Sequence, residues 1–256
     1  MRRDKHIAAL REILRDVRGK FPPKPRPLVQ VPIPTLPTNR PLTAKEGWKS
    51  LCWIVDVATS EGREALSGLS LGLTRIIQAE ILRGLFFDAR PGRSVPSSME
   101  DLLWDPSLSF ASDGRNLRGL LRRRRTSTAV SIQSSAIIAR PWNAQRLVIS
   151  MQNLGPGLSW KSWRNSRNTH SVAWLPWPLI WVDNGNHSMT TAMLRHGGTL
   201  QCGETFDASP LLRAVRTDGE NWIRVSDGQP FAKVRSVPMA ALFTVGQRLL
   251  RVRKRN

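Results

Sequence analysis

The amino-acid sequence predicts an α+β fold, in which an N-terminal helical region is followed by a small α/β domain. Apolar residues recur at helical spacing through much of residues 43–111, which indicates helices. Short strand-like segments then alternate with helix-like segments through residues 129–246. A hydrophobic content of 40% is sufficient for a buried core, so the chain is not expected to be disordered.

Two segments precede the helical region. Residues 1–20 carry apolar side chains at helical spacing with arginines between them, which predicts a basic amphipathic helix. Such a helix either docks on the protein body or faces phosphate or a membrane surface. Residues 21–42 contain eight prolines and predict an extended, semi-rigid linker, with a partner-binding segment as the alternative.

Cap patterns define the helices of residues 43–111. Thr43 and Glu46 form a capping-box pattern, and a second helical run extends from about Glu61 to Phe87. We expect these two helices to pack on each other. Ser98 and Asp101 predict a short helix, and turn residues after it place a boundary near residue 112.

Residues 112–128 form the most basic segment, with one acidic residue, Asp113. Such a segment can contact several nucleic-acid phosphates, or it can be a solvated helix face or linker. The predicted nucleic-acid-binding residues are Arg115, Arg118, Arg122, Arg123, Arg124 and Arg125. A further basic tail is expected at residues 247–256.

The net charge of +20, with an isoelectric point near 11.6, predicts attraction to polyanions such as nucleic acid or anionic lipid. Of the 39 basic residues, 31 are arginines, a skew that a GC-rich genome also produces. The apolar run from Val172 to Val182 is too short to cross a bilayer, and the N-terminus lacks the apolar core of a signal peptide. We therefore expect a cytoplasmic protein without a membrane span.

Within residues 129–246 the elements follow from local composition. The predicted strands and helices are a strand in 126–138, a helix over 147–154, a strand over 179–182, a helix over 188–195, strands over 222–225 and 232–237, and a helix over 239–250.

The turn Asn184-Gly185-Asn186-His187-Ser188 lies between the strand over 179–182 and the helix that follows it. Backbone amides at the start of a helix attract anions, and glycine permits close approach of the backbone to a ligand. His187 can donate to an oxyanion, and Ser188 can cap the helix or contact phosphate. The alternative is an ordinary strand-to-helix turn.

Two segments resemble the ParB/sulfiredoxin superfamily. Ile180-Trp-Val-Asp-Asn-Gly-Asn-His-Ser-Met-Thr-Thr-Ala-Met-Leu-Arg-His-Gly197 is similar to its strand, D-G-x-H-R or G-E-R-R turn, and alanine-containing helix. The segment Ile137-Ile-Ala-Arg-Pro-Trp-Asn-Ala-Gln-Arg-Leu-Val-Ile-Ser-Met-Gln-Asn-Leu-Gly155 is similar to its first box. The N-G-N-H-S form resembles an uncharacterised bacterial branch of the superfamily.

This resemblance implies a nucleotide-phosphate pocket at the turn, used by different members for CTP-switched DNA clamping, ATP-dependent sulfinic-acid repair or small-molecule phosphorylation. It implies a phosphate-binding set of Gly185, Asn186, His187, Ser188 and Arg146, with a nucleoside triphosphate and Mg²⁺ as the expected cofactor. Asn186 replaces the reactive cysteine of sulfiredoxin, which excludes its repair chemistry. Ser188 replaces a phosphate-binding arginine, and Arg140, Arg146 or Arg195 are the candidates to restore that charge.

No Walker-type, G-x-S-x-G or G-x-G-x-x-G pattern is present. The candidate catalytic groups are Asp183, His187 and Glu204, none of them selected by spacing. The histidines lack metal-ligand spacing, and Cys52 and Cys202 have no partner for a zinc site or a disulfide framework, so no metal is predicted.

Six of the ten tryptophans lie between residues 142 and 181, where they serve as core or stack on bases beside Lys161, Arg164 and Arg167. We expect a nucleotide- or phosphate-binding protein associated with nucleic acid, in plasmid or mobile-element maintenance or in defence. The alternatives are an enzyme, a nucleotide hydrolase, nuclease or kinase using the same turn, and a non-catalytic interaction protein. The sequence does not predict the oligomeric state.

Overall fold

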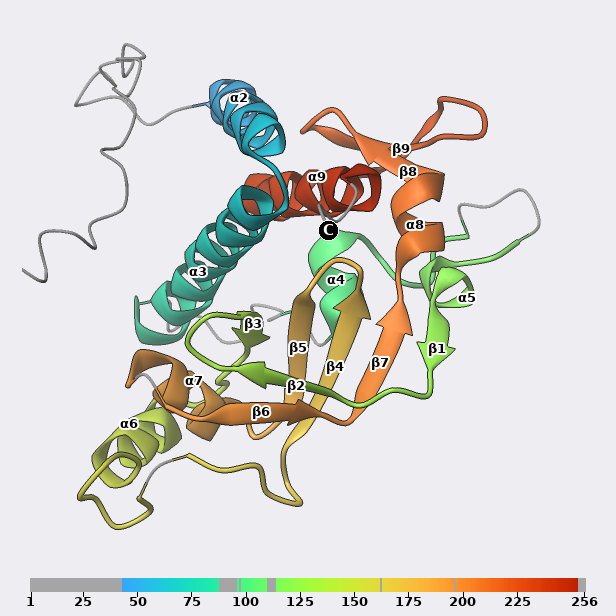
Figure 1. Cartoon of the computed structure of the whole chain (residues 1–256). Helices are drawn as coiled ribbons and strands as arrows, with labels where there is room; N and C mark the ends of the chain where they lie inside the picture. Colours follow the sequence, from blue (N-terminus) through green and yellow to red (C-terminus); the bar gives the residue numbers. More distant parts are fainter. Residues whose placement is uncertain are drawn as a thin grey trace, which may run out of the picture. The chain divides into compact units, whose positions relative to one another are not determined.

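The computed structural model is shown in Figure 1 and describes residues 43–87, 96, 98–109, 114–161, 163–195 and 197–252. The expected helix of residues 1–20 and linker of 21–42 lie outside the described residues, as do residues 253–256 of the expected tail. Helices lead into a mixed sheet with further helices, so the α+β fold is confirmed.

The first helices begin where their caps predict. Helix α2 (Ala44–Glu61) follows Thr43, which forms the capping box with Glu46. Helix α3 (Arg63–Phe87) buries one stripe of residues, and α4 (Met99–Leu103) is capped by Ser98 and Asp101. No helix among the described residues combines the length and the apolar character needed to span a bilayer.

The central sheet has the strand order β1-β7-β4-β5-β3. Its strands are β1 (Arg122–Arg124), β7 (Glu204–Asp207), β4 (His170–Leu175), β5 (Leu179–Asn184) and β3 (Ala136–Ala139). Strands β3 and β5 run parallel, as do β4 and β7, whereas β4–β5 and β1–β7 are antiparallel. The short helix α5 (Leu117–Leu120) leads into β1, so part of the arginine-rich segment forms an edge strand.

Two small antiparallel sheets complete the fold. One has the order β10-β9-β8, from Pro230–Lys233, Asn221–Arg224 and Val215–Thr217, with α8 (Ser209–Ala214) before β8. The other pairs β2 (Thr128–Ser131) with β6 (Thr199–Cys202). The single strand expected in 126–138 is wrong, because a turn after Ser131 separates β2 from β3 and sends them to different sheets.

The two faces of the central sheet are covered differently. Helices α3, α4, α8 and α9 (Val237–Arg251) bury one face, where aromatic rings meet edge to face around Phe243. Helix α7 (Asn186–Leu194) and the β2–β6 pair bury the other, and α6 (Ala144–Asn153) packs on α7. The first core contains residues from 43–111 and from 129–246, which therefore share one hydrophobic cluster. Helix α9 includes residues 247–251 of the expected tail.

A buried glutamine joins the helical region to the sheet. The Gln78 Nε2 group donates to the Ala139 carbonyl at 2.8 Å, and the Ala139 amide donates to Gln78 Oε1 at 2.8 Å. Because β3 is an edge strand, this side chain occupies the hydrogen-bonding positions that a neighbouring strand would use. The Gln78 side chain therefore holds the last residue of β3, Ala139, in place directly before Arg140.

Candidate functional site

The carboxyl ends of β3 and β5 lie side by side, because the two strands are parallel neighbours. Residues 140–143 connect β3 to α6, and Asn184–Gly185 connects β5 to α7, so two helix N-termini meet at this edge. A cavity of about 410 Å³ lies between them. It is lined by Arg140, Trp142, Arg146, Ile149, Ser150, Trp160 and the turn residues Asp183, Asn184, Gly185, Asn186, His187 and Ser188. The structure thus brings all five predicted phosphate-binding residues to one cavity.

Gly185 shapes the start of α7. Its backbone is left-handed, with φ 84° and ψ 19°, and a Cβ there would lie 3.4 Å from the Asn168 carbonyl oxygen. The Ser188 hydroxyl donates to the Gly185 carbonyl at 3.0 Å, so Ser188 does not cap the helix. Helix α7 begins two residues earlier than expected, at Asn186.

The first amides of α7 remain available for an acceptor. No described group accepts a hydrogen bond from the backbone N–H of Asn186, His187 or Ser188, and no side chain caps the helix. The first N–H groups of a helix have no intrahelical partner and carry a partial positive charge. These three amides therefore remain without an acceptor, although side chains of the turn bond within it.

Asn186 holds the two strand exits together. Its side chain is buried; Oδ1 accepts from the Arg140 amide at 2.6 Å, and Nδ2 donates to the Asp183 carbonyl at 3.1 Å. Asn186 was expected to contact phosphate, and its side-chain amide is instead engaged within the protein. Its backbone amide has no acceptor among the described groups.

His187 lies between the two helix starts. The Asn143 amide donates to His187 Nε2 at 3.3 Å, while Asn143 Oδ1 caps α6 by accepting from the Arg146 amide at 2.9 Å. Burial lowers the pKa of His187, and the nearby charge of Arg146 lowers it further. The hydrogen-bond pattern assigns a neutral ring with its proton on Nδ1, which is a donor for a ligand.

Arg146 supplies positive charge at the cavity. Its guanidinium lies 4.8 Å from the ring centre of Trp142, which in turn meets the His187 ring edge to face at 5.3 Å. No carboxylate of the described residues forms an ion pair with Arg146. Arg195 lies at the far end of α7 beside Gly155, so it does not restore the missing charge at the turn.

Of the two acidic candidates, Asp183 lines the cavity and Glu204 does not. Burial raises the pKa of Asp183, and the charges of Glu100 and Glu204 raise it further. Glu204 lies on β7, two strands away, does not line the cavity, and forms an ion pair with Arg123 at 2.7 Å. Across the described parts of the chain, no three His, Cys, Asp or Glu side chains gather to hold a metal ion.

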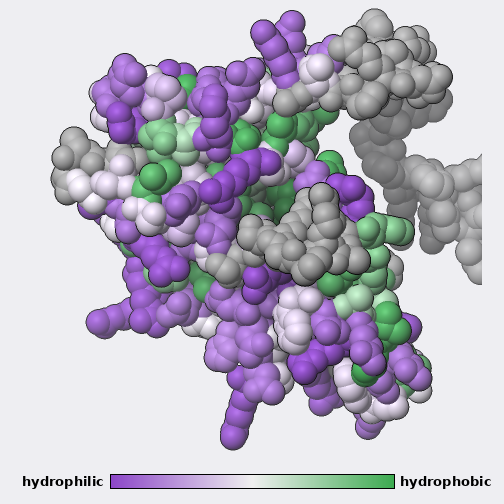
Figure 2. Space-filling model, turned by 180° about the vertical axis from the view of Figure 1, so that it is seen from behind, coloured by the Kyte–Doolittle hydropathy of each residue, from purple (hydrophilic) through white to green (hydrophobic). Residues whose placement is uncertain are grey.

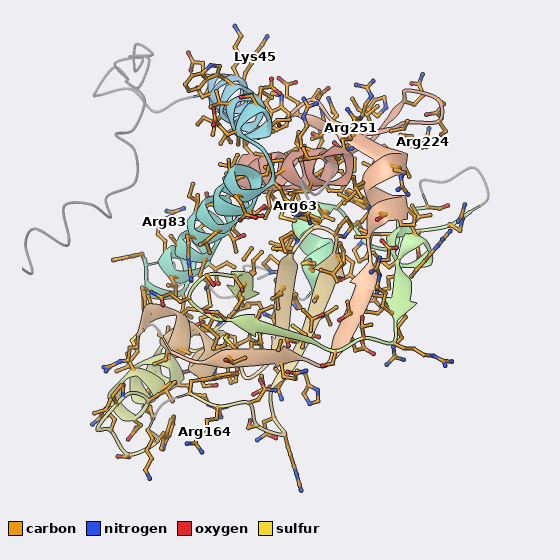
Figure 3. All side chains as sticks on the ribbon, in the orientation of Figure 1. Lys45, Arg63, Arg83, Arg164, Arg224 and Arg251 are labelled. Carbon is orange, nitrogen blue, oxygen red and sulfur yellow. The ribbon has the colours of Figure 1, made fainter. Side chains whose placement is uncertain are left out.

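The segment around α5 and β1, which contains the predicted nucleic-acid-binding arginines, lies at the opposite edge of the sheet from β3 (Figure 1). Three of them face acids: Arg118 with Glu100 at 3.4 Å, Arg123 with Glu204, and Arg124 with Asp207 at 3.1 Å. Basic side chains elsewhere are spread over the whole fold, as Figure 3 shows for Lys45, Arg63, Arg83, Arg164, Arg224 and Arg251. Seen from behind, the described surface is mainly hydrophilic, with hydrophobic residues in separate groups (Figure 2).

A family model described as a family of unknown function, DUF6710, matches residues 61–256. The chain belongs to this family. No curated protein and no solved structure matches the chain. The DUF6710 region begins within the helical part and includes the entire cavity.

Sequence reasoning did not assign two residues of the site. Asn143 positions both Arg146 and His187, and Trp142 connects Arg146 to His187 through its ring. An asparagine before a helix is a recognisable cap, so α6 could have been started at Ala144 from that signal. Its contact with His187 depends on the packing of α6 against α7, for which the sequence carries no local signal.

Proposed function

We propose that this protein binds the phosphate group of a nucleotide in the cavity between α6 and α7, and that it associates with nucleic acid. The observation that carries the proposal is that Asn186, His187 and Ser188, whose backbone amides have no acceptor among the described groups, line the same cavity as Arg146, which has no carboxylate partner there. Amide N–H groups and a guanidinium together form a strong hydrogen-bond donor site for phosphate oxygens.

Two further features support a nucleotide rather than a small anion. The cavity, at about 410 Å³, has the size of a small-molecule site, and the ring of Trp142 offers a surface for a base. The resemblance of both cavity-forming segments to the ParB/sulfiredoxin superfamily points to the same ligand class, a nucleoside triphosphate with Mg²⁺. The net charge of +20 supports association with a polyanion.

The test is calorimetric titration of the four nucleoside triphosphates with Mg²⁺, and of inorganic pyrophosphate, into the wild-type chain. We expect at least one to bind, and Arg146→Ala to weaken it roughly 10-fold or more through loss of a charged hydrogen bond. Arg216→Ala is the matched control, because Arg216 is exposed on β8 and does not line the cavity. Absence of heat with every ligand, or equal affinities for wild type and Arg146→Ala, would overturn the proposal.

A further inference from the structure

The tryptophans of residues 142–181 fall into two groups. Trp163, Trp174, Trp177 and Trp181 are 5% exposed or less and belong to the hydrophobic cores. Trp142 and Trp160 are 54% and 53% exposed, and both line the cavity. An indole ring kept half in water contributes little to the core, so its position beside a basic cavity indicates a contact surface.

Trp160 is held there by a closed turn after α6. Its amide donates to the Asn153 carbonyl at 2.8 Å, and the Gly155 amide donates to the Lys161 carbonyl at 2.8 Å. Lys161 is the one described non-glycine residue with a positive φ, 55°, a conformation that disfavours side chains with a Cβ. The turn accepts this conformation and presents Trp160 and Lys161 next to each other at the surface.

The described residues 160–161 and 163–169, which we name the basic loop, begin at the cavity wall and end beside Gly185. The loop starts at Trp160 on the cavity wall and ends at Asn168 and Thr169, which pack against Gly185. Lys161, Arg164 and Arg167 lie between and are exposed, and Figure 3 shows Arg164 on the loop beside α6. Unlike the arginines of β1, these three have no carboxylate partner among the described residues.

We propose that the cavity and the basic loop bind the phosphorylated end of a single-stranded nucleic acid. This rests on the proposed function, because the terminal phosphate occupies the amides of α7 beside Arg146. The first bases stack on Trp142 and Trp160, and the following phosphates pass along Lys161, Arg164 and Arg167. Alternation of aromatic rings with unpaired basic side chains is the arrangement that binds unpaired strands.

Two physical arguments select a single strand and its end. The bases of a duplex are stacked on each other, so their faces cannot reach two separate indole rings. A terminal phosphate monoester offers three free oxygens and close to two negative charges, whereas an internal phosphodiester offers two oxygens and one charge. Three amides and a guanidinium are the better match for the monoester.

The experiment measures fluorescence anisotropy of labelled ten-nucleotide DNA and RNA strands against the wild-type chain. Separate arms carry a 5′-phosphate, a 3′-phosphate or hydroxyl ends, and a blunt phosphorylated duplex is included. We expect one phosphorylated single strand to bind roughly 10-fold or more tightly than its hydroxyl-ended form, which lacks the charged hydrogen bonds of the terminal phosphate. The same strand should bind roughly 10-fold or more tightly than the phosphorylated duplex, whose bases cannot stack on the two indole rings. The arms identify whether the bound phosphate is at the 5′ or the 3′ end and whether the protein distinguishes DNA from RNA.

Trp160→Ala should weaken binding of the phosphorylated strand roughly 10-fold through lost stacking, a larger loss than it causes for pyrophosphate, which has no base to stack. Trp53→Ala is the matched control, since Trp53 on α2 is 50% exposed and does not line the cavity. Lys161→Gly removes a charge where glycine is conformationally preferred, so it should weaken strand binding without lowering the melting temperature.

The outcomes separate the two proposals. Binding of nucleoside triphosphates or pyrophosphate without any preference for phosphorylated strands would overturn the strand-end inference and leave the proposed function standing. Equal strand binding by wild type and Trp160→Ala, or equal binding of duplex and single strand, would also overturn it. Failure of both mononucleotides and strands to bind would overturn both.

Discussion

The cavity between α6 and α7 and the β1 edge are both rich in arginine, but they differ in what their charges face. At β1, Arg123 and Arg124 pair with Glu204 and Asp207 of the neighbouring strand. At the cavity, Arg146 lies over the Trp142 ring and has no carboxylate partner among the described residues. The densest basic segment of the sequence therefore has much of its charge balanced internally. We therefore expect ligand binding where the fold leaves a basic side chain without an acidic partner.

The largest difference between the two regions should appear in stability. Asn186→Ala leaves the Arg140 amide and the Asp183 carbonyl without partners, which should lower the free energy of unfolding by about 2 kcal/mol. Arg124→Ala removes an exposed ion pair and should cost less than about 1 kcal/mol. Urea denaturation of both variants measures this. Equal losses would mean that the Asn186 contacts do not hold the strand exits.

The second largest difference should appear in how nucleic-acid binding by variants of the basic loop and of β1 depends on salt. The double variant Arg164→Ala/Arg167→Ala should bind single-stranded DNA roughly 10-fold more weakly at low salt, with the log–log salt slope reduced by about 1.4 for two lost phosphate contacts. Arg123→Ala/Arg124→Ala should change the slope by less than about half as much, because those charges are already paired. A larger effect from the β1 pair would reverse the comparison.

The pH dependence of stability should reveal His187. Its folded-state pKa is lowered from 6.5, so its contribution is complete above pH 6.5 and is lost as the pH falls through the folded-state pKa. His187→Gln, which does not titrate, should lose less stability than wild type between pH 7 and pH 5. Thermal melts across this range measure the effect, and parallel curves for the two chains would contradict it.

The smallest expected effect concerns Asp183. Its pKa is raised above 3.8, so its contribution is present below pH 3.8 and is lost as the pH rises through the folded-state pKa. Asp183→Asn should therefore be more stable than wild type at pH 7, by less than about 1 kcal/mol because the carboxyl is only partly buried and water screens its charge, and the gain should vanish toward pH 4. A destabilised Asn variant at pH 7 would show that the ionised carboxylate is needed.

The sequence predicted elements that carry local signals. Thr43 with Glu46 and Ser98 with Asp101 started helices where expected, because a cap is a contact within four residues. The apolar run from Val172 to Val182 did not predict the β4–β5 hairpin, since both strands are buried and no alternation marks the turn at Pro176. Strands β6 and β7 are four residues each, too short for a pattern.

For the candidate site too, the sequence predicted the residues near helix starts but not the contacts between distant segments. The turn at 184–188 and Arg146 were identified from the sequence, because each lies at the start of a helix in a recognisable segment. The internal engagement of Asn186, the placement of Glu204 away from the cavity and the pairing of the β1 arginines were not. Each depends on which strands become neighbours in the sheet, and short strands carry no pattern that specifies it.

The amide of Gln78 has a consequence for how this protein can be divided. A chain starting at residue 129 would keep every residue that lines the cavity, yet it would lack the side chain that covers the free edge of β3. Its exposed amide and carbonyl at Ala139 would then be open to pairing with another molecule. The helical region thus prevents other strands from pairing with the edge of β3. We expect the α/β part to remain monodisperse when it is expressed together with the helical region in one chain.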